Sequence, residues 1–180
     1  MPLPKKNKYT AEEYFALTPG ADRHTELRDG EVIEFASPTT VHQDIAGSLY
    51  SEIRMYIRGN KGECKPFISP LDIKLDDYNV VQPDVFVICD PSKYDDKRCY
   101  CAPDWCIEVL STNRSDDLID KLSLYQKHGV REYWIVDPEN EKVLVYFFER
   151  SELLSIYTFD SDIPVGIYDG KLCIRINDMI

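Results

Sequence analysis

The spacing of apolar residues along the chain predicts three helices. The clearest stripe steps by four residues from Val41 to Ile57, through positions 45, 49 and 53, and indicates a helix of about five turns. Ser37-Pro38 suits the N-cap and first position of this helix. A shorter helix is expected after the capping-box pattern Thr10–Glu13. The third should begin near Ser111 or Ser115, bury Leu118, Leu122 and Tyr125, and end at Gly129.

Strand-like runs fill the intervals between these helices. Residues 24–28 and 31–36 flank Asp29-Gly30, a dipeptide typical of tight hairpin turns. Residues 105–111 form a nearly continuous apolar run, as expected of a central strand covered on both faces. From residue 38, the order helix–strand–strand–strand–helix–strand predicts a mixed sheet whose last strand is parallel to its neighbour. The other predicted strands cover residues 67–75, 80–89, 132–136, 142–148, 155–159 and 172–176, with a loop at 90–103.

Length and composition favour one globular domain covering residues 1–180. The chain has 180 residues, 43% of them hydrophobic, and a formal net charge of −11. That charge argues against a protein that grips nucleic acid through a generally basic surface, because phosphate neutralisation needs Lys and Arg. No apolar run reaches the ~20 residues of a membrane span, and no apolar stretch follows the basic N-terminus as in a signal peptide. We therefore expect a cytoplasmic protein.

Six cysteines raise the question of disulfides and zinc. In a reducing cytosol they are expected to be thiols rather than a disulfide framework. Cys99, Cys101 and Cys106 are clustered, but structural zinc takes four ligands, usually in two closely spaced pairs, and no fourth Cys or His is near in the sequence. The simpler interpretation is that they are small buried side chains.

Two carboxylates lie inside apolar strands, where burial is costly without a partner. Asp84 lies within the run Val80–Ile88, and Glu108 within Trp105–Leu110. If the strands are neighbours, the two acids repel each other unless a cation lies between them, and paired carboxylates suit a hard divalent cation. Each acid could instead lie at a strand end in water or pair with an arginine. Asp104, in a second Pro-Asp pair, would lie about 13 Å from Glu108 along the same strand, which is too far to share one ion.

Lys121 strengthens the metal interpretation. It borders the buried face of the third predicted helix, three residues after Leu118 and four before Tyr125. From there its ammonium can reach the strand end, orient a water molecule and offset negative charge on a phosphate. Without the two acids it would be interpreted as an ordinary lysine whose stem covers apolar surface. His42, beside Val41, is more simply a residue that caps or lines the start of its helix.

In this order of elements, Pro83-Asp84, then Glu108 to Ser111, then Lys121 resemble the PD-(D/E)XK nuclease superfamily. The resemblance is narrower still to a branch of small bacterial restriction-endonuclease-like proteins, and it covers roughly residues 10–150. It implies an α/β restriction-endonuclease-like core with an N-terminal hairpin and C-terminal antiparallel strands. The stretches that carry it are Glu26–Glu31, Ser37–His42, Gln82–Val85, Ile107–Ser111 and Gly129–Pro138.

The resemblance also implies an activity, namely endonuclease cleavage of DNA by water activated at Mg²⁺ or Mn²⁺. Asp84, Glu108 and the Val109 carbonyl would be the metal ligands. The superfamily's usual lysine position is Leu110 here, so the resemblance assigns that catalytic role to Lys121 on the next helix. Because many nucleases that cut both strands are dimers, a homodimer is expected by analogy.

Two questions stay open at this level. Glu26 matches an early glutamate of the branch that completes the acidic cluster or binds a second metal, but an exposed hairpin carboxylate is an equally good interpretation. The net charge and the missing lysine at position 110 leave a competing function, a catalytically inactive nuclease-fold module for protein association. If the chain is a nuclease, Lys and Arg should gather around the mouth of the Asp84–Glu108 site.

Overall fold

A six-stranded mixed sheet forms the centre of the computed structural model, which describes residues 8–18, 25–111, 117–150 and 153–180. The strand order is β11-β10-β9-β8-β6-β3. β8 and β9 are parallel, and the other neighbours are antiparallel, as the predicted crossover through a helix requires. The strands are β3 (Lys65–Ile68), β6 (Val85–Ile88), β8 (Trp105–Val109), β9 (Glu132–Asp137), β10 (Lys142–Phe147) and β11 (Leu154–Thr158).

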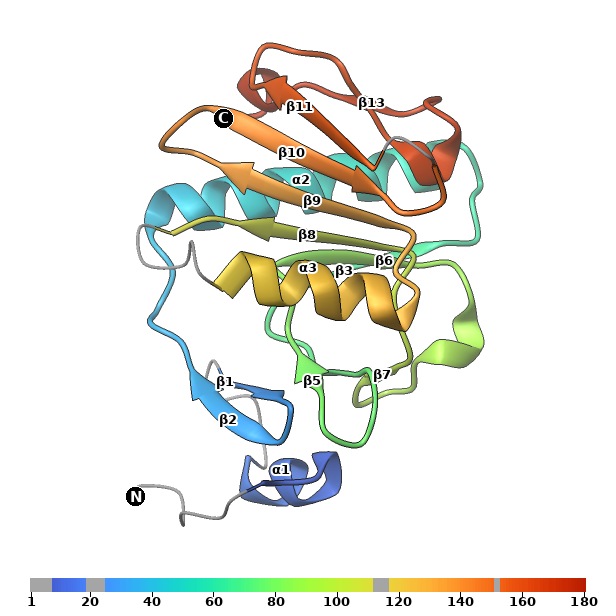
Figure 1. Cartoon of the computed structure of the whole chain (residues 1–180). Coiled ribbons are helices and arrows are strands. Elements are labelled where there is room, and N and C mark those ends of the chain that lie inside the picture. Colours follow the sequence, from blue (N-terminus) through green and yellow to red (C-terminus); the bar gives the residue numbers. More distant parts are fainter. Residues whose placement is uncertain (1–7, 19–24, 112–116, 151–152) are drawn as a thin grey trace.

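Two helices cover opposite faces of this sheet (Figure 1). α2 (Thr40–Gly59) buries Ile45, Leu49 and Ile53 against a face that contains both tryptophans. α3 (Asp117–His128) lies on the other face, where Tyr125 joins Phe86 in a separate core. Strand residues alternate between the two cores, so the central strands are apolar throughout, as predicted for a doubly covered sheet. Neither these nor any other described helix has the length and apolarity needed to cross a bilayer.

A smaller sheet, in the order β2-β1-β5-β4-β7, lies below the main one in Figure 1, beside α1 (Ala11–Leu17). The predicted capping box at Thr10 and Glu13 is present. Asp29 and Gly30 have φ angles of 46° and 84°, as the predicted hairpin turn requires. The strands are β1 (Thr25–Arg28), β2 (Glu31–Glu34), β4 (Ile73–Lys74), β5 (Val80–Val81) and β7 (Cys99–Tyr100). The remaining elements are β12 (Ile163–Pro164), β13 (Cys173–Ile174), η1 (Pro91–Lys93), η2 (Gly166–Tyr168) and η3 (Ile176–Asp178).

Prolines break two strands that the pattern predicted as continuous. The run 67–75 is divided into β3 and β4 around Pro70, and the run 80–89 into β5 and β6 around Pro83. Proline donates no backbone N–H to a ladder, so each run changes from one sheet to the other at that point. The break places Asp84 immediately before β6 rather than in the middle of a strand.

The start of α2 also differs from the prediction. The N-cap is Thr39, whose side chain accepts a hydrogen bond from the His42 amide, and not Ser37. Val41 is 54% exposed and does not belong to the buried stripe, in which His42 takes the first place. The Ser115 predicted to cap α3, and the side chain of Leu118, lie outside the described residues.

The expectation that all six cysteines are thiols is wrong for one pair. Cys64 and Cys89 form a disulfide, because the pairing of Lys65 with Ile88 brings the preceding and following residues opposite each other. Cys99 and Cys106 are buried thiols, as expected, whereas Cys101 is exposed. Within the described parts of the chain, no group of three or more His, Cys, Asp or Glu is arranged to hold a metal ion, so the structure gives the zinc alternative no support.

Candidate active site

Asp84 and Glu108 lie close together at one end of the β6–β8 pairing. The pairing ends with Val85 facing Ile107, and Asp84 and Glu108 are the neighbours of these two residues in the chain. The Asp84 side chain accepts a hydrogen bond from the amide of Val109, the residue after Glu108. Both carboxylates are buried. The structure therefore brings together the two acids that the sequence placed on neighbouring strands.

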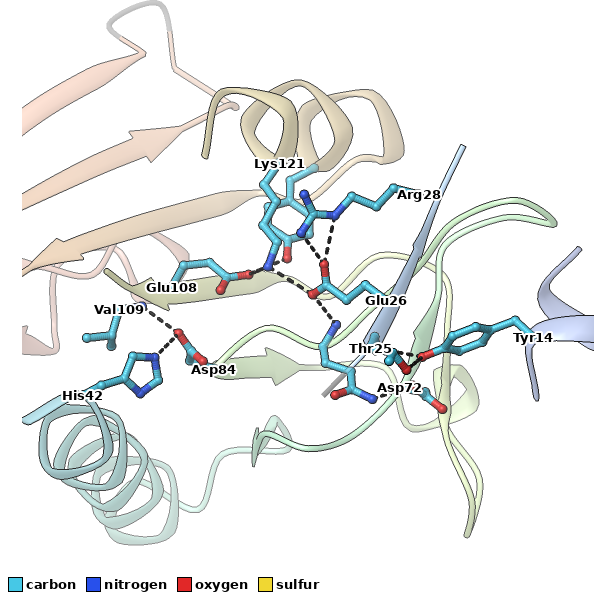
Figure 2. A network of polar contacts seen from close by, with 12 residues as sticks. Tyr14, Thr25, Glu26, Arg28, His42, Asp72, Asp84, Glu108, Val109 and Lys121 are labelled. Carbon is cyan, nitrogen blue, oxygen red and sulfur yellow. Dashed lines mark hydrogen bonds and ion pairs between the residues drawn. The ribbon is translucent and has the colours of Figure 1, made fainter. Parts of the chain in front are cut away.

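The Asp84 carboxylate is held through one of its oxygens (Figure 2). Oδ2 accepts a hydrogen bond of 2.8 Å from the Val109 amide and lies 3.0 Å from His42 Nε2. No described residue donates a hydrogen bond to Oδ1. Val109 thus acts here through its backbone amide, and the use of its carbonyl as a metal ligand stays a prediction.

The Glu108 carboxylate contacts α3. Its Oε1 accepts hydrogen bonds from Lys121 Nζ at 2.7 Å and from the Tyr125 hydroxyl at 2.9 Å. Lys121 and Tyr125 are one helical turn apart, so the same face of α3 presents both. Burial raises the pKa of Glu108 against the opposing effect of Lys121, and the negative charge of Asp84 raises this pKa further. This repulsion between two neighbouring carboxylates is what a cation bound between them would relieve.

Glu26 is a buried member of the cluster and not an exposed hairpin carboxylate. Its Oε1 accepts hydrogen bonds from the Gln82 amide at 2.9 Å and from Lys121 Nζ at 3.0 Å, and its Oε2 accepts one from Arg28 Nε at 2.9 Å. Burial alone would raise the pKa of Glu26, but Lys121 and Arg28 lower this pKa to about 2. Because both oxygens already have cationic partners, Glu26 is placed to hold Lys121, and a role in binding a second metal stays a prediction.

Lys121 bridges the two glutamates at the centre of the network in Figure 2. Burial lowers the pKa of Lys121, but the charges of Glu108 and Glu26 outweigh this and raise the pKa above its usual value. The ammonium therefore stays protonated at neutral pH. Lys121 and Arg28 together balance the charges of Glu26 and Glu108, so Asp84 is the additional negative charge of the cluster.

A cavity of about 230 Å³ opens beside this cluster, and Asp84, His42 and Glu26 are among its walls. Its other described walls are apolar or neutral polar, such as Gln82 and Ser111, and they include no Lys or Arg. The predicted concentration of basic residues at the mouth of the site is therefore not found in the described walls. A second cavity of about 450 Å³, at the end of β8, shares Ser111 with the first.

The side chains present fit a hard divalent cation in kind. Asp84 Oδ1 and Glu108 Oε2 accept no hydrogen bond from the described residues. Mg²⁺ and Mn²⁺ prefer such oxygen ligands, and Mg²⁺ is typically bound by one or two carboxylates together with waters and substrate oxygens. Since the described residues contain no group of three metal-binding side chains, the protein would supply two carboxylates, and solvent and substrate the rest.

Several residues of the site carried little or no functional signal in the sequence. His42 was interpreted as lining its helix and Tyr125 as core, but each has a polar partner in the cluster. Their helical spacing was informative, because His42 precedes Ile45 by three residues and Tyr125 follows Lys121 by four. Arg28 and Gln82 had no such signal. The Gln82 amide reaches Glu26 across 56 residues of sequence through strand pairing.

Glu26→Gln is expected to remove a pH-dependent part of the folding stability. The pKa of Glu26 is about 2 in the folded protein, against an ordinary value of 4.5, so the charged carboxylate stabilises the folded state above pH 4.5. This contribution, roughly 3 kcal/mol at most, is lost as the pH falls from 4.5 to 2. The pKa of Glu108 is raised in the folded protein, so its contribution to folding stability decreases as the pH rises.

Urea unfolding between pH 7 and pH 2 measures this effect. The difference in free energy of unfolding between wild type and Glu26→Gln should narrow below pH 4.5. Glu31→Gln, at an exposed position on the same hairpin, is the control. Its free energy of unfolding should differ from that of wild type by the same amount at every pH. A constant difference between wild type and Glu26→Gln over the whole range would contradict the expected pairing.

Comparison with known proteins relates the chain to a nuclease family and a nuclease structure. A family model named Uma2 and described as "Putative restriction endonuclease" matches residues 11–165. Among solved structures, the chain is similar to a crystal structure described as "a putative nuclease belonging to DUF820", from Anabaena variabilis ATCC 29413. The TM-score is 0.77 and the sequence identity 25%, over 94% of this chain and 96% of that chain. No curated protein matches the chain.

Proposed function

The chain belongs to the Uma2 family of restriction-endonuclease-like proteins, and from this we propose that it is a divalent-metal-dependent endonuclease that hydrolyses phosphodiester bonds in DNA. Family membership and the likeness to a nuclease structure support nuclease function at the coarse level. The use of Mg²⁺ or Mn²⁺ and the choice of DNA are the finer parts of the proposal. The use of a divalent metal rests on the chemistry of the site, and the choice of DNA on the family's description as a putative restriction endonuclease.

The arrangement of Asp84, Glu108 and Lys121 is the observation that carries the proposal. Two buried carboxylates lie at one end of the β6–β8 pairing, and each keeps one oxygen to which no described residue donates a hydrogen bond. A buried ammonium lies 2.7 Å from one of them. A purely structural ion pair needs one carboxylate for each cation, and the further acid beside it is costly without a bound cation.

Each residue then has a definite task. Asp84 and Glu108 would hold the cation, which when bound supplies Lewis-acid stabilisation and lowers the pKa of a coordinated water. Lys121 stays protonated and offsets negative charge on the phosphate. Glu26, itself held by Arg28, keeps the Lys121 ammonium beside Glu108. Tyr125 donates to Glu108 Oε1 and so favours the use of the other oxygen for the cation.

Cleavage of supercoiled plasmid DNA in the presence of Mg²⁺ or Mn²⁺ tests the proposal. The wild-type protein should nick or linearise the plasmid, and chelation with EDTA should stop the reaction. Asp84→Ala should be inactive in the same assay. An RNA of matching sequence, assayed in parallel, separates DNA from RNA as substrate. Equal inactivity of wild type and variant across metals and both nucleic acids would count against the proposal.

We also propose that the nuclease works as a homodimer joined through β11. β10 pairs with one side of β11, and none of the described strands pairs with its other side. Leu154 and Ile156 are exposed on this strand, Ile156 to 61%, and the strand carries no charged residue. A second copy offers the same edge, so antiparallel pairing of two β11 strands about a two-fold axis would satisfy both edges.

Sedimentation analysis tests the homodimer. The wild-type protein should have twice the mass of the chain, and Ile156→Lys should shift it to the monomer because the substitution places a charge in the interface. Tyr78→Lys replaces an exposed aromatic residue on another part of the surface and should leave the dimer intact. A monomeric wild type would rule this interface out.

A second candidate function is a catalytically inactive nuclease-fold module for protein association. The observation that favours it is the absence of Lys and Arg from the described walls of the cavity, since substrate phosphates need positive charge. This function requires no divalent cation at Asp84 and Glu108. A calorimetric titration in which Mn²⁺ binds wild type but not Glu108→Ala would decide against it.

A further inference from the structure

His42 lies where the first turn of α2 meets the acidic cluster. Its side chain is only 4% exposed, and its amide donates to the Thr39 side chain that caps the helix. The residue is three positions before Ile45 and seven before Leu49, so it begins the buried stripe of α2. That position directs the imidazole at the sheet edge where Asp84 precedes β6, and His42 Nε2 lies 3.0 Å from Asp84 Oδ2 (Figure 2).

The contacts of Asp84 are one-sided. The Val109 amide and His42 Nε2 both lie on Oδ2, and the structure describes no donor to Oδ1. A single hydrogen bond from a backbone amide leaves a carboxylate free to rotate about that bond. Two donors from different directions restrain both the position and the rotation of the group. Removal of the histidine donor would free the Asp84 side chain to turn about its terminal bond.

The other ring nitrogen distinguishes His42 from a residue kept for packing alone. Nδ1 is buried and has no hydrogen-bond partner among the described residues. A buried polar atom without a partner costs about 1–3 kcal/mol, and an apolar side chain of similar size would avoid that cost. The Nε2 contact to Asp84 is the polar interaction that such a replacement would lose.

We propose that His42 is a positioning residue for Asp84. It holds Oδ2 together with the Val109 amide and thereby presents Oδ1 to the divalent cation. The proposal rests on the metal-dependent function above, since it needs a cation at Asp84. It assigns His42 no contact with substrate. In well-defined metal sites, partners of this kind, which orient a ligand without touching the metal, contribute about 10–100-fold to metal affinity or activity.

Isothermal titration of metal-free protein with Mn²⁺ tests the proposal without relying on turnover. His42→Ala should weaken Mn²⁺ binding about 10–100-fold. His42→Gln should recover most of the affinity, because the glutamine amide nitrogen can take the place of Nε2 as a donor. Gln43→Ala, at the adjacent exposed position in the same cavity wall, is the matched control and should bind Mn²⁺ like wild type. Thermal unfolding of each metal-free variant shows whether it is folded.

The outcomes separate this proposal from the function on which it rests. If Mn²⁺ binding is lost in Asp84→Ala but His42→Ala binds like wild type, the metal site stands and the role of His42 is overturned. The role is also overturned if folded His42→Gln binds as weakly as His42→Ala, because the donor would then not matter. If wild type binds no Mn²⁺, both proposals fail. The proposal is supported if His42→Ala weakens Mn²⁺ binding, His42→Gln restores most of the affinity, and Gln43→Ala binds Mn²⁺ like wild type.

Discussion

Asp84→Ala is expected to lower metal-dependent DNA cleavage by about 1,000-fold or more. A metal acting as Lewis acid contributes several kcal/mol to transition-state stabilisation, and each 1.36 kcal/mol is a factor of ten in rate. Asp84 offers one of the two unused carboxylate oxygens, and the remaining acid, Glu108, is already bonded to Lys121 and Tyr125. Loss of Asp84 therefore leaves a single, already engaged carboxylate to bind the cation.

The variant should fold, which makes the activity measurement interpretable. Asp84 is not paired with Lys or Arg in the described contacts, so its removal leaves no uncompensated buried lysine or arginine. Initial rates of plasmid nicking and calorimetric Mn²⁺ binding should fall together. Asp44→Ala, an exposed acid on the first turns of α2, removes the same charge and should retain wild-type rates. Full cleavage by a folded Asp84→Ala protein would exclude Asp84 as a metal ligand.

Lys121→Ala should have the largest effect on stability. The ammonium lies between two buried carboxylates, at 2.7 Å from Glu108 and 3.0 Å from Glu26. Removing one partner of such a buried network leaves uncompensated charge and typically costs about 3–5 kcal/mol. Cleavage activity should be lost as well, because the variant lacks the positive charge that lies beside Glu108 and would offset negative charge on the phosphate. Chemical denaturation and plasmid nicking measure the two effects separately.

A double variant distinguishes the structural task of Lys121 from the catalytic one. Lys121→Met combined with Glu26→Gln removes one charge of each sign while keeping most of the buried volume, so part of the lost stability should return. Activity should not return. Lys127→Ala, on the exposed side of the last turn of α3, is the control for helix propensity. If the stable double variant cleaves DNA like wild type, Lys121 is structural only.

Local patterns predicted those parts of the fold that depend on nearby residues. Four-residue spacing located α2, a capping box located α1, and Asp29-Gly30 located the hairpin. The same spacing placed Lys121 beside Tyr125, and so explains why both reach Glu108. The apolar runs alone did not reveal that Pro70 and Pro83 redirect the chain from one sheet to another. That change required the three-dimensional pairing of β4 with β5 and of β3 with β6.

Contacts between distant residues were outside the reach of such patterns. The disulfide between Cys64 and Cys89 depends on the register of β3 and β6, and its two cysteines are 25 residues apart in sequence. The charge balance of the site could not be predicted either. The count of charged residues gives a net charge of −11. It does not show that Lys121 and Arg28 pair with buried glutamates instead of lining the cavity.

The bridge made by Lys121 also has a consequence for the order of events during synthesis of the chain. Glu26 and Lys121 are 95 residues apart in sequence, and His42 and Asp84 are 42 apart. Contacts of such long range form only after the intervening chain has been brought together, and they slow folding. A growing chain thus carries its acids long before the lysine that organises them has been made. The site is complete only when α3 has docked, so a partly synthesised or misfolded copy would lack the contacts of Lys121 with Glu26 and Glu108.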